Sequence, residues 1–297
     1  MTLRHFKIFV AVCDTMNMTS AAQALFMSQS AVSQAVAELE KYYDVRLFER
    51  LSRKLYLTQA GKKLLSYARH MIRMNTEIEN DMRALHEVGF IRIGASVTVC
   101  TYVLPQLASR FKNISPMTDL EVVEDNTEKI EGMLLHDEID IGLVEGEISS
   151  PDILMRPFME DELVLVCAAS HRFANRAEVE PRELETESFI VREKGSGTRK
   201  TFEESMSAHS VKWKPVWICN NSDTIKAAVG EGLGVSVISA RAVSNEIDSG
   251  TLIPLQVKGI RFGRQFKITY HKNKYLTESM EQFVGLITAK NNVYYRD

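Results

Sequence analysis

The sequence predicts an α/β protein in three parts: a mainly helical N-terminal module, a long connecting helix and a larger α/β body. Over residues 1–88 the apolar side chains recur mostly at helical spacing. From residue 90 onward, β-prone apolar runs alternate with helical ones, which is typical of an α/β fold. The length of 297 residues is enough for about two domains.

Composition narrows the class of protein. The chain is 45% hydrophobic and 25% charged, as in ordinary globular proteins. No apolar run approaches the ~20 residues of a membrane span, and the N-terminus enters a helical pattern directly, unlike a signal peptide. Four scattered cysteines predict reduced thiols: Cys13, Cys100, Cys167 and Cys219. We therefore expect a cytoplasmic protein with no membrane partner.

The net charge of −3 conceals an asymmetry. Residues 1–88 carry 12 Lys and Arg against 9 Asp and Glu, so this part is at +3 and the remainder at −6. Residues 46–73 hold eight Lys and Arg and one acid, Glu49. A solvated helix face is one interpretation. A basic module on an acidic body instead favours a polyanion partner at one end.

Three helices are predicted in the N-terminal module. Apolar spacing gives a helix over about 2–15. Thr19 or Ser20 then caps a short second helix, and Ser28 caps a third that runs to about residue 44. Two short helices joined by a tight turn describe a helix-turn-helix.

The third helix has an outer face of short polar side chains near its start: Gln29, Ser30, Ser33 and Gln34. A helix that enters the DNA major groove needs such a face, because acidic side chains would repel phosphates and long ones would hold the helix away. Gln and Ser both donate and accept hydrogen bonds, so this face predicts base reading. A protein-docking helix is the alternative.

A short hairpin, or wing, follows the third helix. Leu55 and Leu57 alternate with polar residues, and Thr58 then caps the next helix. The hairpin would place three cations against the DNA phosphate backbone: Arg50, Arg53 and Lys54.

Residues 59–88 carry a heptad pattern. Its seam steps by four and three residues through Leu64, Ala68, Met71, Asn75, Ile78, Met82 and Leu85. A 3.5-residue repeat of this length is typical of a helix that pairs with a partner. We therefore expect a dimer through this helix, with two recognition helices on a two-fold-symmetric DNA site.

These stretches resemble the LysR-type transcriptional regulators. "TSAAQALFMSQSAVSQAVAELEKYYDVRLFER" (19–50) holds the family's A-A-x-x-L, S-Q-x-A-V-S, L-E and L-F-E-R elements, and "LYLTQAGKKLL" (55–65) continues the likeness. Ser30 stands where many members have proline. The resemblance implies a winged helix-turn-helix domain over 1–58, a linker helix over 59–88 and an effector-binding regulatory domain over 89–297.

The body alternates between strand and helix patterns. Strands are predicted at Arg92–Ala95, Leu120–Glu124, Asp140–Val144, Leu163–Ala168, Phe189–Arg192, Val216–Cys219, Val235–Ser239 and Phe266–Tyr270. Helices are predicted at Pro105–Lys112, Thr127–His136, Arg199–Ala208, Thr224–Glu231 and Thr277–Lys290. This alternation predicts mostly parallel sheets, and the length of the body predicts two subdomains around a cleft. Ligands in such folds lie beyond the carboxyl ends of strands, at helix N-termini.

Several turns that lead into helices of the body are rich in hydroxyl and amide groups: Ser96, Thr98 and Thr101; Asn126 and Thr127; Ser196 and Thr198; Asn221 and Ser222. Gly195 and Gly197 free backbone N–H groups and Arg199 adds charge, so residues 195–199 predict a cradle for an anion. Ordinary helix capping also explains each turn alone. Their convergence on one cleft would favour a ligand site.

The body resembles the type-2 periplasmic-binding-protein-like effector domain of LysR-type regulators, in which crossing strands join two Rossmann-like lobes. "IDIGLVEG" (139–146) and "EGLGVSVIS" (231–239) carry this likeness. It implies lobe I over about 89–163 and 266–297 and lobe II over about 164–265. The implied effector-binding residues are Ser96, Thr98, Asn126, Thr127, Val144, Glu145, Ser196, Gly197, Thr198, Arg199 and Asn221.

"REKGSGTR" (192–199) is similar to the subgroup that controls sulfur assimilation and carbon fixation, whose effectors are small anions or phosphorylated metabolites. The family resemblance further implies a dimer or tetramer that also pairs through the regulatory domain, and contact with RNA polymerase.

An enzyme and a thiol redox sensor are the two alternative functions. For an enzyme, the sequence holds no P-loop, no dinucleotide fingerprint after a strand, no zinc-ligand spacing and no nucleophile elbow, so we expect no catalysis, no cofactor and no metal. A thiol redox sensor of the same fold would use Cys100, which the pattern places near the cleft, although buried structural cysteine is the commoner role.

Overall fold

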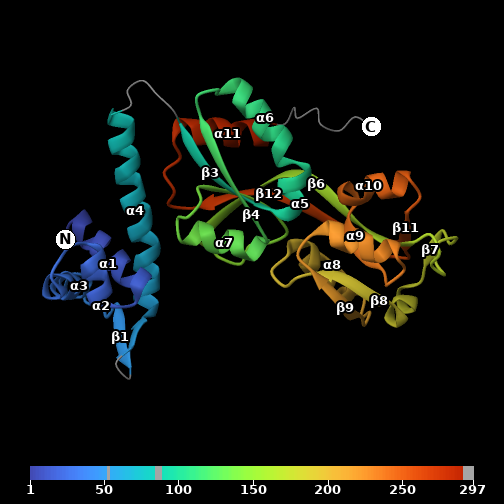
Figure 1. The fold of residues 1–297 in the computed structure, drawn as a ribbon, viewed down its shortest axis with the longest axis horizontal. Helices are drawn as coiled ribbons and strands as arrows, with labels where there is room; N and C mark the ends of the chain where they lie inside the picture. The colour runs from blue at the N-terminus through green and yellow to red at the C-terminus, as the bar shows by residue number, and fades with distance from the viewer. Residues whose placement is uncertain (52–53, 84–88, 290–297) are drawn as a thin grey trace. The chain divides into compact units, whose positions relative to one another are not determined.

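The computed structural model describes residues 1–51, 54–83 and 89–289. They form an N-terminal unit that ends with the long helix and a C-terminal unit that begins at Gly89 (Figure 1). In chain order the elements are α1 (Leu3–Thr15), α2 (Met18–Ala24), α3 (Gln29–Tyr43), β1 (Phe48–Leu51), β2 (Lys54–Leu57), α4 (Gln59–Arg83), β3 (Phe90–Ser96), α5 (Val97–Tyr102), α6 (Leu104–Ile114), β4 (Asp119–Asp125), α7 (Thr127–Leu135), β5 (Ile141–Glu145), β6 (Ile153–Ala168), β7 (Glu178–Val179), a 3₁₀ helix (Pro181–Thr186), β8 (Ser188–Arg192), α8 (Gly197–Ala208), β9 (Lys214–Cys219), α9 (Ser222–Gly230), β10 (Ser236–Ser239), α10 (Ala240–Asp248), β11 (Leu252–Val257), β12 (Phe262–His271) and α11 (Glu278–Thr288).

Side-chain caps define two helix starts in the N-terminal unit. Ser28 accepts a hydrogen bond from the Ala31 N–H at 3.2 Å, which confirms it as the cap of α3. The predicted cap of α2 at Thr19 or Ser20 was wrong. Asn17 accepts from both of their N–H groups, at 2.8 and 3.1 Å, because the helix begins earlier, at Met18.

The long helix α4 packs one side into the core of the N-terminal unit and leaves other apolar residues exposed. Ala68 is fully buried in the core that α1, α2 and α3 share, so the prediction that the seam faces a partner along its whole length was wrong at its start. Further along, Met71 and Ile78 are 41% and 51% exposed and remain available to a partner. The side chain of Met82 and all of Leu85 lie outside the described residues.

The sheets of the C-terminal unit are mixed, not mostly parallel as predicted. In the described residues one sheet runs in the order β4-β3-β5-β12-β6-β11-β7, with β10 also on β6, and β8 pairs separately with β9. β3 is parallel to β4 and β5, but β12 is antiparallel to both β5 and β6. The reason is that β6 and β12 are long strands that run in opposite directions through both halves of the unit.

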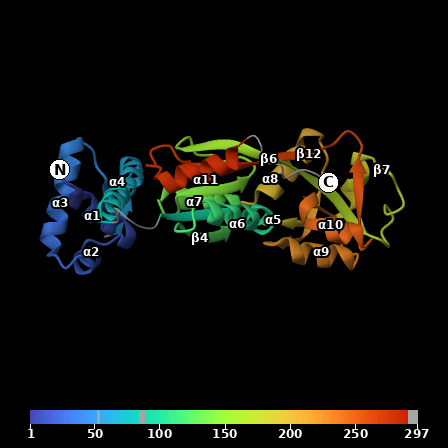
Figure 2. The same cartoon turned by 90° about the horizontal axis from the view of Figure 1, so that it is seen from above.

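These halves are the two lobes. The core of lobe I packs β3, β5 and β12 against α6 and α11, which lie on one face of its sheet with α7 on the other (Figure 1). Lobe II has separate buried clusters built from β6, β8, β10 and β11 with α8 and α9. β6 and β12 pass between the lobes (Figure 2), and their register places Arg264 opposite Asp161.

Candidate functional site

The outer face of α3 is exposed and internally ordered. Gln29, Ser30 and Gln34 are exposed and Ser33 is half-buried. The amide of Gln29 donates to the Ser33 hydroxyl at 2.8 Å, and that of Gln34 donates to the Glu38 carboxylate at 2.9 Å. The face thus presents short polar groups in fixed positions, as a major-groove helix requires.

The hairpin β1–β2 lies beside this helix. Glu40 of α3 accepts the N–H groups of Leu47 and Phe48, at 2.8 and 3.2 Å, and so fixes the chain where it enters the hairpin. Arg50 and Lys54 are exposed, whereas Arg53 lies outside the described residues. A groove of about 530 Å³ between α3 and the hairpin is lined by Ser33, Ala37, Arg46, Arg50 and Leu55, among others. Arg46 and Arg50 of this lining suit a phosphate backbone, and the same lining also holds Glu40 and Glu49.

In the C-terminal unit, the hydroxyl-rich turns converge on one carboxylate, Glu145. Ser96 Oγ donates to Glu145 Oε2, and the hydroxyls of Thr98 and Thr198 lie 3.4 and 3.5 Å from Oε1. Thr127 Oγ1 donates to the Glu145 carbonyl at 3.1 Å. All five residues are at most 4% exposed. We call this group, with Arg264, the Glu145 cluster.

Strand ends and glycines assemble the cluster from both lobes. β3 and β5 are parallel neighbours, so Ser96 and Glu145 meet at their carboxyl ends. Gly197, at the start of α8 in lobe II, packs so closely that a Cβ there would lie 2.2 Å from the Glu145 carbonyl oxygen. The Glu128 N–H donates to the Gly195 carbonyl at 3.1 Å, from lobe I to lobe II. The lobes are therefore closed on each other at this point.

Arg264 enters the cluster from the crossing strand β12. Its Nη1 donates to Thr198 Oγ1 at 2.8 Å and lies 3.8 Å from Glu145 Oε1. Its Nε donates at 2.7 Å to Asp161, which also accepts from Ser239 Oγ at 2.9 Å. The sequence analysis predicted neither Arg264 nor its partner Asp161 as a site residue. A sequence signal for Arg264 exists. Arg264 lies two residues after Phe262 in the same strand, so both side chains are on the same face, and Phe262 is buried.

Two donors of this region have no acceptor among the described residues. They are the Ser196 hydroxyl and Arg264 Nη2, in residues that are 2% and 7% exposed. Ser196 precedes α8 but its side chain does not cap the helix. Buried donors are normally paired, so both are suited to a ligand acceptor.

The other predicted effector residues make contacts outside the Glu145 cluster. Arg199 donates to Glu203 at 2.7 Å and lies 5.8 Å from the Trp213 ring, so its charge is engaged within lobe II. Asn221 caps α9 through the Thr224 N–H. Asn126 accepts from the Lys129 N–H at the start of α7, and Val144 is buried in β5.

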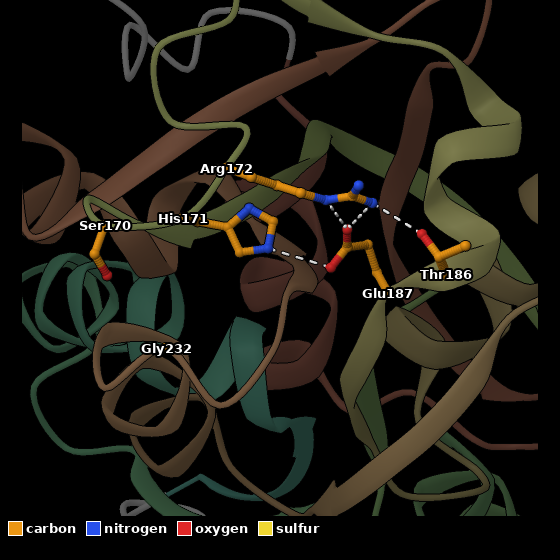
Figure 3. A pocket seen from close by; sticks show the side chains of 6 residues that line it. All are labelled: Ser170, His171, Arg172, Thr186, Glu187 and Gly232. Carbon is orange, nitrogen blue, oxygen red and sulfur yellow. Dashed lines mark hydrogen bonds and ion pairs between the residues drawn. The ribbon is translucent and has the colours of Figure 1, made fainter.

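Lobe II has a separate cavity of about 510 Å³ (Figure 3). Its polar groups pair with one another: Glu187 accepts from Arg172 Nε at 2.8 Å and pairs with His171 Nε2 at 3.2 Å, and Arg172 also reaches Thr186. The Arg172 guanidinium lies 4.5 Å from the Phe173 ring. His171, Arg172, Thr186 and Glu187 of its lining are therefore already engaged with one another.

The thiols are unsuited to rapid oxidation. Burial raises the pKa of Cys13 to about 12 and the pKa values of Cys100 and Cys167 to about 11, and it also raises the pKa of Cys219. Reactive cysteines need the opposite shift, towards thiolate at neutral pH.

In the described part of the chain, no three His, Cys, Asp or Glu side chains gather as metal ligands, and no helix is long and apolar enough to cross a membrane.

The two units together define a class: a regulator that binds DNA through a winged helix-turn-helix and is controlled by a small molecule through a two-lobed domain. Residues 3–62 match the family model of the bacterial regulatory helix-turn-helix protein, lysR family, and residues 86–292 match that of the LysR substrate binding domain. The chain belongs to the LysR family of transcriptional regulators.

Relatives share this organisation over the whole chain. The Escherichia coli K12 transcriptional regulator YeiE is 33% identical over 290 residues, or 98% of each chain. The RuBisCO operon transcriptional regulator of Allochromatium vinosum is 30% identical, over 97% of this chain and 96% of its own. The Synechocystis CcmR regulatory domain, solved in complex with 2-PG, is 25% identical with a TM-score of 0.64 and covers 69% of this chain and 99% of its own.

Proposed function

We propose that this regulator responds to a small anionic effector that binds between the lobes at the Glu145 cluster. The observation that carries the proposal is the convergence of hydroxyl-rich turns from both lobes where two buried donors, Ser196 Oγ and Arg264 Nη2, lack acceptors. Anionic oxygens would satisfy both donors. The 2-PG complex of the CcmR domain supports a small ligand for a domain of this kind.

The effector acts by changing how the lobes are held. The contacts from α8 to Glu145 and from Glu128 to Gly195 exist while the lobes are closed. A ligand shifts this equilibrium to the extent that it binds one arrangement better than the other. The change in lobe arrangement alters the orientation of the DNA-binding units and their contact with RNA polymerase. This regulation takes place in the cytoplasm.

On DNA, α3 enters the major groove. Gln29, Ser30, Ser33 and Gln34 read base edges, while Arg50, Arg53 and Lys54 hold phosphates. The exposed polar face of α3 and the exposed Arg50 and Lys54 of the hairpin support these roles.

Two exposed apolar surfaces support self-association. Met71 and Ile78 of α4 are available for pairing of linker helices. β9 pairs with β8 on one side, and its Val216, Trp217 and Ile218 are 45%, 48% and 61% exposed. An apolar edge strand of this kind is suited to a protein interface. Two independent interfaces would build a tetramer from dimers.

Thermal unfolding of the full chain with sulfate, thiosulfate, phosphate, dicarboxylates and sugar phosphates tests the effector site. A ligand at 100 times its Kd adds about 2.7 kcal/mol and raises the Tm by several degrees. We expect Thr198→Ala to abolish the shift and Thr201→Ala, one turn further along α8, to retain it. A shift that survives Thr198→Ala would place the ligand elsewhere.

A further inference from the structure

The Glu145 cluster contains a negative charge at its centre. Glu145, Asp161 and Arg264 have side chains only 1%, 1% and 2% exposed, and they set two carboxylates against one guanidinium. Arg264 is closest to Asp161, at 2.7 Å, and reaches Glu145 only at 3.8 Å. Asp161 is further compensated by Arg241 at 3.5 Å. Glu145 therefore relies mainly on hydroxyl groups.

This charge restricts which anions can enter. Glu145 already accepts the hydroxyls that a bound anion would need, those of Ser96, Thr98 and Thr198. An anion with no proton to give would lie beside a buried like charge, which is strongly unfavourable. The free donors, Ser196 Oγ and Arg264 Nη2, nonetheless call for a ligand with acceptor oxygens.

We propose that Glu145 selects an effector that carries a hydrogen-bond donor next to its anionic oxygens. The donor is a hydroxyl, an ammonium or an acidic proton, and it binds the Glu145 carboxylate. The anionic oxygens accept from Arg264 Nη2 and Ser196 Oγ. With Glu145 paired to the ligand, the hydroxyls of Thr98 and Thr198 are released to donate to those same oxygens. This inference rests on the proposed function and specifies the ligand of that site.

Matched pairs of probes test this selection by calorimetry on the full chain at pH 6.5. Inorganic phosphate keeps at least one proton at this pH and sulfate keeps none, while glycolate differs from acetate by one hydroxyl at equal charge. A hydrogen bond to a buried carboxylate predicts about 10- to 100-fold tighter binding of phosphate than of sulfate, and of glycolate than of acetate.

Glu145→Gln removes the charge and keeps the size. We expect this variant to bind sulfate at least tenfold more tightly than the natural protein does, so that the ratio of the phosphate and sulfate Kd values approaches one. Glu147→Gln is the control, because Glu147 is 58% exposed and pairs with Lys267 outside the cluster. It should leave the ratio unchanged.

The natural protein alone makes the inference falsifiable if Glu145→Gln does not fold. Equal binding of sulfate and phosphate, or of acetate and glycolate, would overturn the role of Glu145 while leaving an anion site in place. Failure of all four probes to bind either the natural protein or Glu145→Gln would overturn the proposed effector site itself, and this inference with it.

Discussion

Gly197→Ala is the sharpest test of how the lobes close. Gly197 is the first residue of α8, and a Cβ at this position would lie 2.2 Å from the Glu145 carbonyl oxygen and 2.6 Å from Glu145 Cγ. The first distance falls 1.2 Å short of ordinary contact at 3.4 Å. The atom in the way belongs to the backbone, so a side-chain rotation cannot relieve the clash. The start of α8 must move away from lobe I.

The cost follows from these distances. Overpacking a close contact destabilises by about 1–3 kcal/mol. The better helix propensity of alanine applies to helix interiors and Gly197 is the first residue of α8, so it offsets little of this and the net loss is about 1–3 kcal/mol. At roughly 2–4 °C per kcal/mol for a unit of this size, the Tm should fall by about 2–12 °C. The movement also separates Thr198 from Glu145, so anions should stabilise the variant less.

Thermal unfolding followed by circular dichroism measures both effects, with Gly285→Ala as the matched control. Gly285 lies within α11 and is exposed, and a Cβ there would meet nothing within 4 Å. This variant should gain about 0.5–1 kcal/mol from helix propensity. A Gly197→Ala protein that melts as high as Gly285→Ala would refute the close packing of α8 on Glu145.

Three further outcomes are expected. Gln34→Ala should weaken specific DNA binding by about 1–3 kcal/mol without changing the dependence of log K on log salt, whereas Lys54→Ala should weaken binding to all sequences and lower that slope by about one. Fluorescence anisotropy titrations at several salt concentrations separate the two effects. A reduced slope in Gln34→Ala would contradict base reading. Trp217→Glu on the exposed β9 should lower the oligomeric state in sedimentation velocity. Trp213→Phe should not, because Trp213 directly precedes β9 but packs inward against Phe202 of lobe II. An unchanged distribution in Trp217→Glu would exclude β9 as an interface. Because the pKa of Cys100 is raised to about 11, its reaction with iodoacetamide at pH 7.5 should be roughly 300-fold slower than that of free cysteine. The reaction rate should increase as the pH approaches 11. Fast alkylation at neutral pH would support the redox alternative.

The N-terminal unit could be predicted from sequence because its signals are local. Ser28 caps α3 through an N–H three residues away, and the alternation of Leu55 and Leu57 identifies the hairpin directly. The seam on α4 shows the limit of such reasoning. Heptad spacing marks an apolar face, but it does not distinguish burial of Ala68 in the same chain from burial against a partner.

The candidate site could be predicted only in pieces. Ser96, Thr127 and Thr198 were identified from turn chemistry, but their meeting at Glu145 depends on strand order and on the packing of α8. Arg199 was expected to face the ligand because it is the charged residue of its turn. Its position in the helix instead aligns it with Glu203, four residues later, as helical spacing favours.

Arg264 connects the site to the strands that join the lobes. It stands opposite Asp161 in the register of β12 and β6, and Asp161 accepts from Ser239 immediately before α10 of lobe II. From the same position its guanidinium reaches Thr198 and Glu145. A ligand that pairs with Arg264 therefore acts on the crossing strands themselves, not only on the rims of the cleft. Since both lobes are built on β6 and β12, we expect a change in the Arg264–Asp161 pair to alter both lobes together.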